Sequence, residues 1–452
     1  MSVNTQSLFE EKSFWLRNYG EYIPNPAFAG DARADVAIIG AGFTGLNTAW
    51  QFKRDNPNAR VIVLEAAVVG YGASGRNGGF SMKLFGLEPE VTVLRWGKQR
   101  TVEAHRYMQK AVAHVQDLVT EHELQSDYHH TGMFRVSYSQ PQLKRVEKTY
   151  KLFQDLGIDD DMRWYSQEDL RQEFQTERFL GGMYESETGI LDPCKQVREL
   201  KRLALAAGVE IYEMSPVTNV RREADRVVID TERGQIRAHK LVIATNAYSR
   251  QLNGPKKLKN RQFPMWTYQV VTERLSTEQW QSIGWDKRQS FEDNRQLVHY
   301  FRPTADGRIT MGGGDVVSPT SECMDRDFSP SSWQHCEQHL KWIYPQLRDV
   351  RIEYRWGGPI SVNMDMTPEI GFLGDERIIY ASGCIGHGVS LTHLNGRLIA
   401  DLLNEDKTEL TDFWIVDRKA LALPGNALSY LGGKVIRHGL RAWDRWEERG
   451  LK

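Results

Sequence analysis

The sequence DVAIIGAGFTGLN at residues 35–47 decides the fold, together with the run VIVLE at residues 61–65. Its apolar first residues predict a strand that leads directly into the Gly-x-Gly-x-x-Gly pattern at 40–45. A helix should follow and stop at the Asn-Pro pair at 56–57, because proline and the residue before it disfavour a helix. A second apolar strand then ends in Glu65, twenty residues after the last glycine of the pattern. This order predicts a dinucleotide-binding βαβ unit.

Each residue type in this turn has a chemical reason. Gly40 permits a tight exit from the strand, Gly42 lets the backbone approach a pyrophosphate, and Gly45 allows close packing of the helix on the sheet. Free N–H groups at the helix start favour phosphate charge, and a carboxylate after the second strand accepts hydrogen bonds from ribose hydroxyls, which argues against a 2′-phosphate. The alternative is an ordinary tight turn. The residues expected at the dinucleotide are Gly40, Gly42, Phe43, Thr44, Gly45, Glu65 and Ala66.

A second glycine-rich loop, GYGASGRNGG at 70–79, indicates which dinucleotide binds. A nicotinamide enzyme has no general need for it, whereas a longer, buried FAD must be held along its pyrophosphate and ribityl chain. The alternative is a solvated surface loop. At this point the chain resembles the FAD oxidoreductases typified by D-amino-acid oxidase, sarcosine oxidase and glycine oxidase, and the loop is most similar to the γ-glutamylputrescine oxidoreductase branch. The loop residues expected at FAD are Gly72, Ala73, Ser74, Arg76, Asn77, Gly78 and Gly79.

A third motif, IIYASGCIGHGVS at 378–390, repeats the order of strand, glycine loop and helix. A second helix N-terminus is therefore expected to point at an electron-rich group. In the resembling family this loop meets the pyrimidine edge of the flavin, the strand at 240–248 crosses beneath the first glycine loop, and the backbone near Val217 borders the adenine. His387 is as compatible with a structural role as with a functional one, and we do not expect it to be a catalytic base. The resemblance adds Val217, Ala244, Thr245, Gly383, Ile385, Gly386, His387, Gly388, Val389 and Ser390 to the cofactor residues.

The rest of the chain predicts an interleaved architecture. Alternating strands with few helical runs follow residue 263, and such a pattern indicates an antiparallel sheet. The predicted fold class is α/β with an α+β second domain, a Rossmann-type FAD-binding domain interleaved with an antiparallel-sheet substrate domain. The C-terminal tail carries apolar residues among basic ones; it could lie on a membrane, but we expect it to pack on its own protein or a partner subunit. The expected segments are an N-terminal arm (1–34), FAD-binding parts (35–120, 187–260 and 359–423), substrate parts (121–186 and 261–358) and a C-terminal helical tail (424–452).

Composition excludes several classes of function. A net charge of −1 over 452 residues leaves no electrostatic footprint for nucleic acid or an acidic membrane. The N-terminus does not resemble a signal peptide, and no apolar run approaches the roughly 18 residues of a membrane span. Four scattered cysteines show no zinc spacing, so we expect no metal and reduced thiols in a cytoplasmic protein. They are Cys194, Cys323, Cys336 and Cys384.

The FAD is expected to be bound non-covalently. Members similar to sarcosine oxidase carry a cysteine just before a Thr-Pro-acid segment, and the matching run at 362–369 has none. Cys384 lies in the third glycine motif, so a link through that residue remains an alternative.

The resemblance implies removal of a hydride equivalent from the carbon beside a nitrogen, delivered to flavin N5, to give an imine that hydrolyses. The expected substrate is a primary or secondary amine carrying an acidic group, of the amino acid, N-alkyl amino acid, acylated diamine or aminophosphonate type. Oxygen or an electron carrier would reoxidise the flavin, and oligomers are compatible with the sequence. The alternatives are oxidation of a 2-hydroxy acid or polyol phosphate and a flavin-binding non-catalytic subunit.

Substrate residues are the least defined part of the sequence. Aromatic residues of the expected antiparallel sheet are candidates for the wall that orients the substrate, although each fits a sheet core equally well. Arg302 and Arg355 could bind a carboxylate or have structural roles. The wall candidates are Trp266, Tyr268, Tyr300, Tyr354 and Trp356. The residues proposed for catalysis are His387, Trp266, Tyr300, Arg302 and Trp356.

Overall fold

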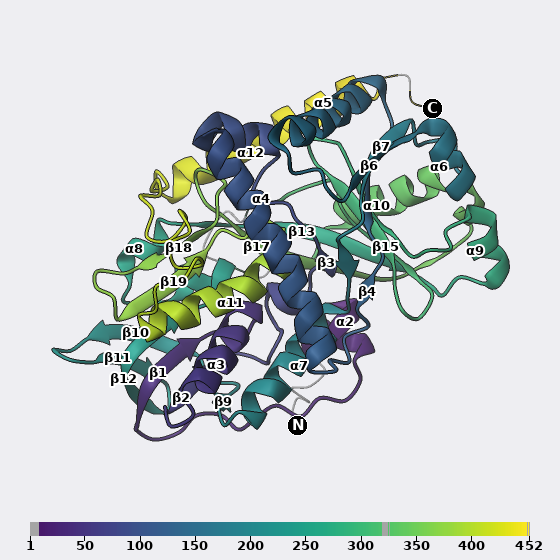
Figure 1. Ribbon diagram of the computed structural model, residues 1–452. Coiled ribbons are helices and arrows are strands. Elements are labelled where there is room, and N and C mark those ends of the chain that lie inside the picture. Colours follow the sequence, from purple (N-terminus) through teal and green to yellow (C-terminus); the bar gives the residue numbers. More distant parts are fainter. Residues whose placement is uncertain (1–8, 319–323, 325, 450, 452) are drawn as a thin grey trace.

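A computed structural model describes residues 9–318, 324, 326–449 and 451 of the chain. Two large sheets lie beside each other, one with helices α3, α4, α7 and α11 around it and the other with α6, α9 and α10 (Figure 1). The combination of a parallel and a largely antiparallel sheet confirms the predicted α/β fold class. Cys323 lies outside the described residues.

The first sheet has the order β10-β11-β12-β1-β2-β9, and β19 and β18 join it at β12. Its central strands are parallel, and their side chains are buried on both faces, which explains the continuous apolar runs in the sequence. The parallel strands are β1 (Ala32–Ile39), β2 (Val61–Leu64), β9 (Glu210–Tyr212), β12 (Gly234–Ile243) and β19 (Ile378–Ser382). The antiparallel additions are β10 (Val217–Arg222), β11 (Val227–Thr231) and β18 (Glu369–Phe372).

Helices cover one face of this sheet and enclose its larger core. Helix α3 packs against α7 and α11, and α4 runs along α11. Figure 1 shows these helices in front of the sheet at the lower left. Their bounds are α3 (Phe43–Asp55), α4 (Pro89–Glu121), α7 (Pro193–Ala206) and α11 (Gly388–Asn404).

The second sheet has the order β17-β13-β16-β15-β14-β5-β7-β6. Neighbouring strands are antiparallel, as expected, except that β14 pairs with β5 in parallel. This pair joins residues far apart in the sequence, so no local pattern predicts its direction. The strands are β5 (Met133–Ser137), β6 (Met162–Ser166), β7 (Gly181–Glu185), β13 (Phe263–Thr272), β14 (Ser290–Asp293), β15 (His299–Pro303), β16 (Ile309–Gly313) and β17 (Ile352–Val362).

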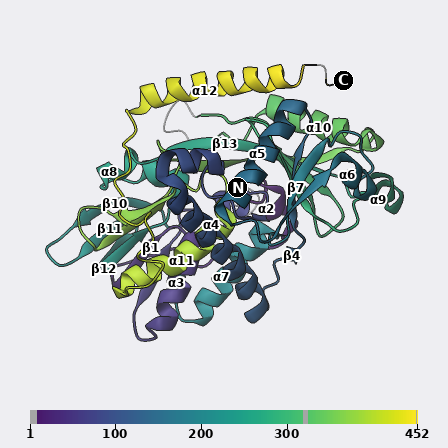
Figure 2. The same cartoon turned by 45° about the horizontal axis from the view of Figure 1, so that its top comes forward.

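Shorter elements connect and cover the two sheets. Strands β3 (Phe80–Ser81), β8 (Gly189–Ile190) and β4 (His129–His130) form a small third sheet. Helix α12 (Asn426–Glu447) lies across the outside of the molecule, along the top in Figure 2. Among the described residues, no helix is both long and apolar enough to cross a membrane. The remaining helices are α2 (Phe14–Asn18), α5 (Gln140–Leu156), α6 (Gln167–Glu173), α8 (Lys256–Lys259), α9 (Thr277–Ile283) and α10 (Pro330–Ile343).

One expectation about an element needs correction. The strand expected at 240–248 ends at Ile243, and a 3-10 turn, Asn246–Gln251, replaces its second half. Helix α4 is bent at Gly97, whose φ of 81° is not helical. The predicted domain boundaries remain predictions, although β17 runs on past residue 358 and α4 runs on past residue 120.

Candidate functional site

A cavity of about 800 Å³ runs between the first sheet and the two glycine-rich loops. Its volume is within the usual range for ligand and cofactor sites. The start of helix α3 and Glu65 line one part of it, and the start of helix α11 lines another. Both helix starts therefore face the same enclosed space.

The first glycine turn is shaped by close backbone contacts. Gly40 has a φ of +103°, and a Cβ there would lie 2.7 Å from the carbonyl oxygen of Ala244. A Cβ on Gly45 would lie 2.0 Å from the carbonyl oxygen of Gly40. Any side chain at either position would force the strand, the turn and the helix apart.

Hydrogen bonds hold the two loops around the cavity. The hydroxyl of Ser74 accepts from the backbone N–H of Phe43 at 3.0 Å, which ties the second loop to the start of α3. The carboxylate of Glu65 accepts from the N–H groups of Ala41 at 2.9 Å and Ala67 at 3.0 Å. Burial raises the pKa of Glu65, and these backbone hydrogen bonds oppose the increase. Glu65 thus fixes the loop as well as facing the cavity.

The cavity fits an extended FAD. Gly42 is the N-cap of helix α3 and His387 that of helix α11, and neither residue's own side chain caps its helix, although Ser74 accepts from the first N–H of α3. Their free N–H groups suit a pyrophosphate at one helix and the electron-rich pyrimidine edge of a flavin at the other. Gly40, Gly42 and Glu65 would hold the ADP part, and Gly386 and Gly388 the flavin part.

The predicted cofactor residues fall into two groups, and their roles remain predictions. The first group lines the cavity: Gly40, Gly42, Phe43, Thr44, Glu65, Ala66, Gly72, Ala73, Ser74, Asn77, Val217, Ala244, Thr245, Gly386, Gly388 and Val389. The second group does not line the cavity: Gly45, Arg76, Gly78, Gly79, Gly383, Ile385, His387 and Ser390. Lining residues that the sequence did not indicate include Tyr71, Asn246, Tyr248, Pro359, Ile360, Leu391, Thr392 and Asn395.

Arg76 and Trp356 join the second loop to the second sheet. The buried guanidinium of Arg76 binds Asp327 at 2.7 Å and the carbonyl of Tyr71 at 2.7 Å. The indole N–H of Trp356 donates to the carbonyl of Arg76 at 2.9 Å. Trp266 is also fully buried, with the Arg76 guanidinium 5.8 Å from its ring. These contacts place Trp266 and Trp356 away from the cavity wall.

The guanidinium of Arg302 forms hydrogen bonds with the backbone. Its guanidinium donates to the carbonyl oxygens of Gly78 at 2.5 Å, Leu191 at 2.6 Å and Pro303 at 3.0 Å. Burial lowers its pKa to about 9, while Asp192 opposes that shift. Arg355 instead binds Glu337 at 3.3 Å on the surface. Neither arginine offers a free guanidinium to a carboxylate at the cavity.

A polar and aromatic cluster lies next to the flavin end, beside His387. Tyr300 packs edge-on against Phe80, with ring centroids 5.5 Å apart. Glu292 is the register partner of Tyr300 in the neighbouring strand, and its Oε1 lies 3.9 Å from Nε2 of His387. The other carboxylate oxygen, Oε2, is buried and accepts no hydrogen bond from a described residue, but it forms an ion pair with the guanidinium of Arg135 at 3.6 Å. Sequence reasoning missed Glu292, although an acid in a buried run, SFED at 290–293, was a usable signal.

Arg288 precedes Glu292 by four residues and has a φ of 60°. It forms no hydrogen bond or ion pair with any described residue, and its Nε is buried. Burial lowers the pKa of Arg288, and its charge contributes to lowering the pKa of His129, after the larger effect of that residue's own burial. An unpaired cation thus lies near the small sheet that contains Phe80.

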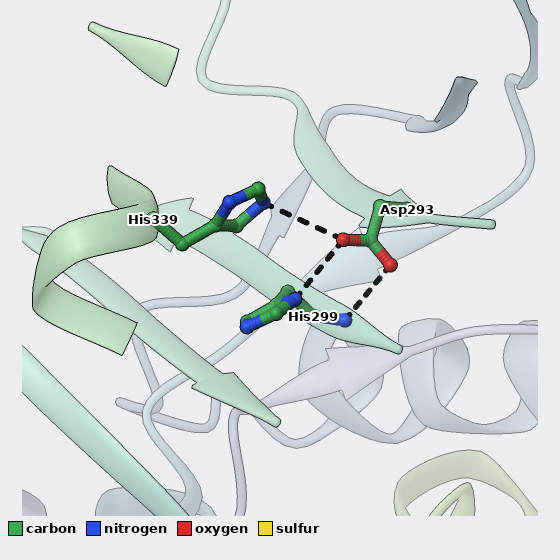
Figure 3. A group of neighbouring side chains, drawn as sticks. All are labelled: Asp293, His299 and His339. Atoms are coloured by element: carbon green, nitrogen blue, oxygen red, sulfur yellow. Dashed lines mark hydrogen bonds and ion pairs between the residues drawn. The ribbon is translucent and has the colours of Figure 1, made fainter. Parts of the chain in front are cut away.

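Asp293, His299 and His339 form a compact buried group at the turn between β14 and β15 (Figure 3). No metal was expected from the sequence. Asp293 already accepts from Arg295 at 2.5 Å and from the ring of His299 at 3.1 Å, and Arg295 lies 2.6 Å from the ring of His339. Burial would raise the pKa of Asp293, but the Arg295 charge and the histidine hydrogen bonds hold it well below its usual range. The arginine supplies the positive charge that a metal would bring.

The described cysteines differ in their surroundings. Cys194 and Cys336 are buried, and burial raises the pKa of each thiol to about 12. Cys384 lines the cavity, with its sulfur 3.7 Å from Oδ1 of Asn246. It is therefore the cysteine to test for a link to the cofactor.

Comparisons with known proteins agree with this geometry. Gamma-glutamylputrescine oxidoreductase of Escherichia coli (strain K12) is 30% identical over 403 residues, which cover 89% of this chain and 91% of that protein. Glycine oxidase of Bacillus subtilis (strain 168) is 24% identical over 298 residues, 64% of this chain and 74% of that protein. The crystal structure of glycine oxidase from Geobacillus kaustophilus matches with a TM-score of 0.73 at 19% identity, covering 86% of this chain and 100% of that chain. A family model described as FAD dependent oxidoreductase, DAO, matches residues 35–402. The chain therefore belongs to the DAO family of FAD dependent oxidoreductases.

Proposed function

We propose that this enzyme oxidises an amine at the carbon next to its nitrogen, and that Glu292 binds the amine. The observation that carries the proposal is the buried carboxylate of Glu292, whose Oε2 has no hydrogen bond to a described residue. Arg135 is its ion-pair partner at 3.6 Å, beyond hydrogen-bond distance, so this oxygen keeps an unfilled hydrogen-bonding position that an ammonium group would satisfy. Glu292 lies beside His387, which separates the lining residues Gly386 and Gly388, so an ammonium at Glu292 would lie next to the flavin end of the cavity.

The protein's part in the reaction is binding, deprotonation and orientation. FAD, when bound, accepts the hydride equivalent from the substrate carbon. Glu292 attracts the charged amine and takes one proton from it at Oε2, because only the neutral amine has the lone pair that drives C–H cleavage. Phe80 and Tyr300 form an aromatic wall that orients the neighbouring carbon and excludes water. The imine that forms then hydrolyses in solution.

The substrate we favour is an acylated diamine with a remote acidic group, the type named in the E. coli relative. The guanidinium of Arg302 already donates to three backbone carbonyl oxygens, which argues against its binding a carboxylate directly beside the reacting carbon. Arg288 could instead bind an acid at a distance, since it has no partner among the described residues and lies four residues from Glu292.

A 2-hydroxy acid is the second candidate. The Glu292 and His387 pair is an acid–histidine arrangement of the kind that alcohol oxidation uses as a base, and the sequence alone did not indicate it. Such a substrate carries its carboxylate beside the reacting carbon, so the engaged donors of Arg302 count against it. The cytoplasmic location, the electron acceptor and the oligomeric state remain predictions.

Anaerobic mixing of the FAD-loaded enzyme with N-alkyl amino acids, D-amino acids, acylated diamines, aminophosphonates and 2-hydroxy acids tests the proposal. We expect acylated diamines to bleach the flavin fastest, and peroxide on admitting air would identify oxygen as the acceptor. Glu292→Gln should lower kcat/KM for amines by about thirtyfold or more, since losing a charged hydrogen bond costs about 2 kcal/mol. Bleaching by hydroxy acids alone would overturn the amine assignment.

Matched variants distinguish the role of Glu292 from that of Arg288. Glu168→Gln removes an exposed acid of helix α6 and should leave kcat/KM unchanged. Arg288→Gln should raise KM for an amine with a remote acid by about tenfold or more, and should not affect the same amine with that acid amidated. An equal effect on both amines would exclude Arg288 as the residue that binds the acid.

A further inference from the structure

Helix α12 packs on the protein through its polar face. Arg437 and Arg441 both bind the carboxylate of Asp315, each with a contact of 2.6 Å. Asp444 accepts from the backbone N–H groups of Gln296 at 2.7 Å and Leu297 at 3.0 Å. The expected packing of the tail on its own protein is therefore present, but polar groups make it.

The other acidic side chains of this segment also form ion pairs with the body of the protein. Glu447 binds Arg145 at 2.7 Å, and Glu448, the residue after the helix, binds Arg295. Together with Asp444, these are all the acids from the helix start to Arg449. The side of α12 that faces away from the body therefore presents no free carboxylate.

The outward side of the helix is apolar. Its large apolar side chains are between 51% and 65% exposed, whereas a surface helix normally turns such residues toward the core. Spacings of three, four and seven residues place them along one stripe of the helix. Figure 2 shows α12 along an outer edge of the molecule. The exposure of these side chains shows that the described residues leave the stripe uncovered. The stripe consists of Leu428, Leu431, Val435, Ile436, Trp443 and Trp446.

Basic residues follow one border of the apolar stripe. Lys434, His438, Arg445 and Arg449 are four, seven and four residues apart, so they lie on one side of the helix, and all are exposed. An apolar stripe with leucine and tryptophan beside a basic border is the pattern of helices that lie in the plane of a membrane surface. The positive border complements a negatively charged lipid surface.

We propose that α12 binds the enzyme to an anionic lipid bilayer, lying in the plane of its surface without crossing it. The net charge of −1 argued against an acidic membrane, but it is a sum over the whole chain and does not reveal the local basic border of this helix. A second copy of the chain is the less suitable occupant, because pairing two such helices would bring two basic borders together with no free acid of the helix to neutralise them. The proposal does not depend on the substrate of the enzyme.

Sedimentation of the FAD-loaded enzyme with vesicles tests the proposal. Phosphatidylcholine vesicles containing phosphatidylglycerol should bind at least about tenfold more protein than phosphatidylcholine alone, and raising salt to about 1 M should remove the difference. Val435→Gln with Trp446→Gln should lower binding to the mixed vesicles at least about tenfold. Lys434→Gln, Arg445→Gln and Arg449→Gln together should remove the preference for anionic lipid.

Two controls keep the result independent of folding. Ile23→Gln with Leu205→Gln removes exposed apolar side chains from other parts of the surface and should not change binding. Flavin content and Tm verify each variant, and quenching of wild-type tryptophan fluorescence by acyl-brominated lipid tests insertion without any substitution. An absence of binding of the wild-type protein to anionic vesicles would overturn the proposal. So would dimers in lipid-free solution that the α12 substitutions dissociate, because the helix would then be a subunit interface.

Discussion

Binding of FAD depends on single atoms at the first glycine turn. A Cβ on Gly42 would lie 2.9 Å from the hydroxyl oxygen of Ser74, which is itself fixed by the N–H of Phe43. We predict that Gly42→Val yields colourless protein, since the side chain would occupy the cradle and displace that hydroxyl. The ratio of flavin to protein absorbance measures the loss. Gly432→Val is the control, because a Cβ there meets nothing within 4 Å, and full flavin content in Gly42→Val would refute the assigned site.

Cys384 is the candidate residue for a covalent bond to the cofactor. Its sulfur lies in the cavity lining near Asn246, so the alternative of a covalent link must be tested there. We predict that acid precipitation leaves a colourless pellet and a yellow supernatant, for the wild type and for Cys384→Ser alike. Colour that stays in the wild-type pellet and leaves it in the variant would establish a link through this sulfur.

Helix α11 is joined to its neighbours by one buried histidine. The Nδ1 of His393 lies 2.6 Å from the carbonyl of Val389, its Nε2 lies 3.0 Å from Nε2 of Gln196 in α7, and its ring contacts Phe43 at the start of α3. Burial lowers the pKa of His393 to about 3. The folded protein therefore keeps this ring neutral at a pH where the unfolded chain protonates it.

This shift predicts acid sensitivity of the helix layer. Between pH 3 and about 6.5 the unfolded state binds more protons than the folded state, so stability falls as pH falls, by about 2 kcal/mol at pH 5 for this group. Asp192 acts in the opposite direction, because burial raises its pKa to about 6 and the folded state then binds its proton more readily. Thermal unfolding should show a smaller loss of Tm from pH 7 to pH 5 in His393→Gln than in the wild type. An equal loss in both proteins would contradict the prediction, and the exposed His438→Gln is the control.

Elements were predictable where the signal is local. Strand β2 has the bounds 61–64 expected from its apolar run, and α3 ends before the Asn-Pro pair because proline chemistry is local. The second half of the strand expected at 240–248 was wrong, because small residues after Ile243 turn into the cavity wall instead of continuing the sheet. The parallel pairing of β14 with β5 and the position of Glu292 beside His387 depend on contacts between distant residues. Periodicity along the chain contains no information about such contacts.

At the scale of the whole molecule, the two sheets are joined around the cavity by buried arginines. Arg76 reaches from the second glycine loop to Asp327, and Arg302 reaches from β15 back to the carbonyls of Gly78 and Leu191. The guanidinium of Arg302 also lies 4.8 Å from the ring of Trp15 in the N-terminal arm. The sequence left open whether Arg302 binds a carboxylate or has a structural role, because an arginine beside a strand does not reveal which groups surround it.

The structural role of Arg302 leads to a separate prediction. Arg302→Met leaves buried carbonyl oxygens without donors, at about 1–3 kcal/mol each, so Tm should fall by at least about 3 °C and the flavin should dissociate more readily. Arg355→Met is the matched control, because its half-exposed pair with Glu337 contributes at most about 1 kcal/mol. A substrate-binding arginine would behave differently: its loss would raise KM for carboxylate-bearing substrates and leave Tm and flavin content unchanged. Measuring Tm, flavin content and KM on the same preparations distinguishes the two roles, and the structure requires that the first two change.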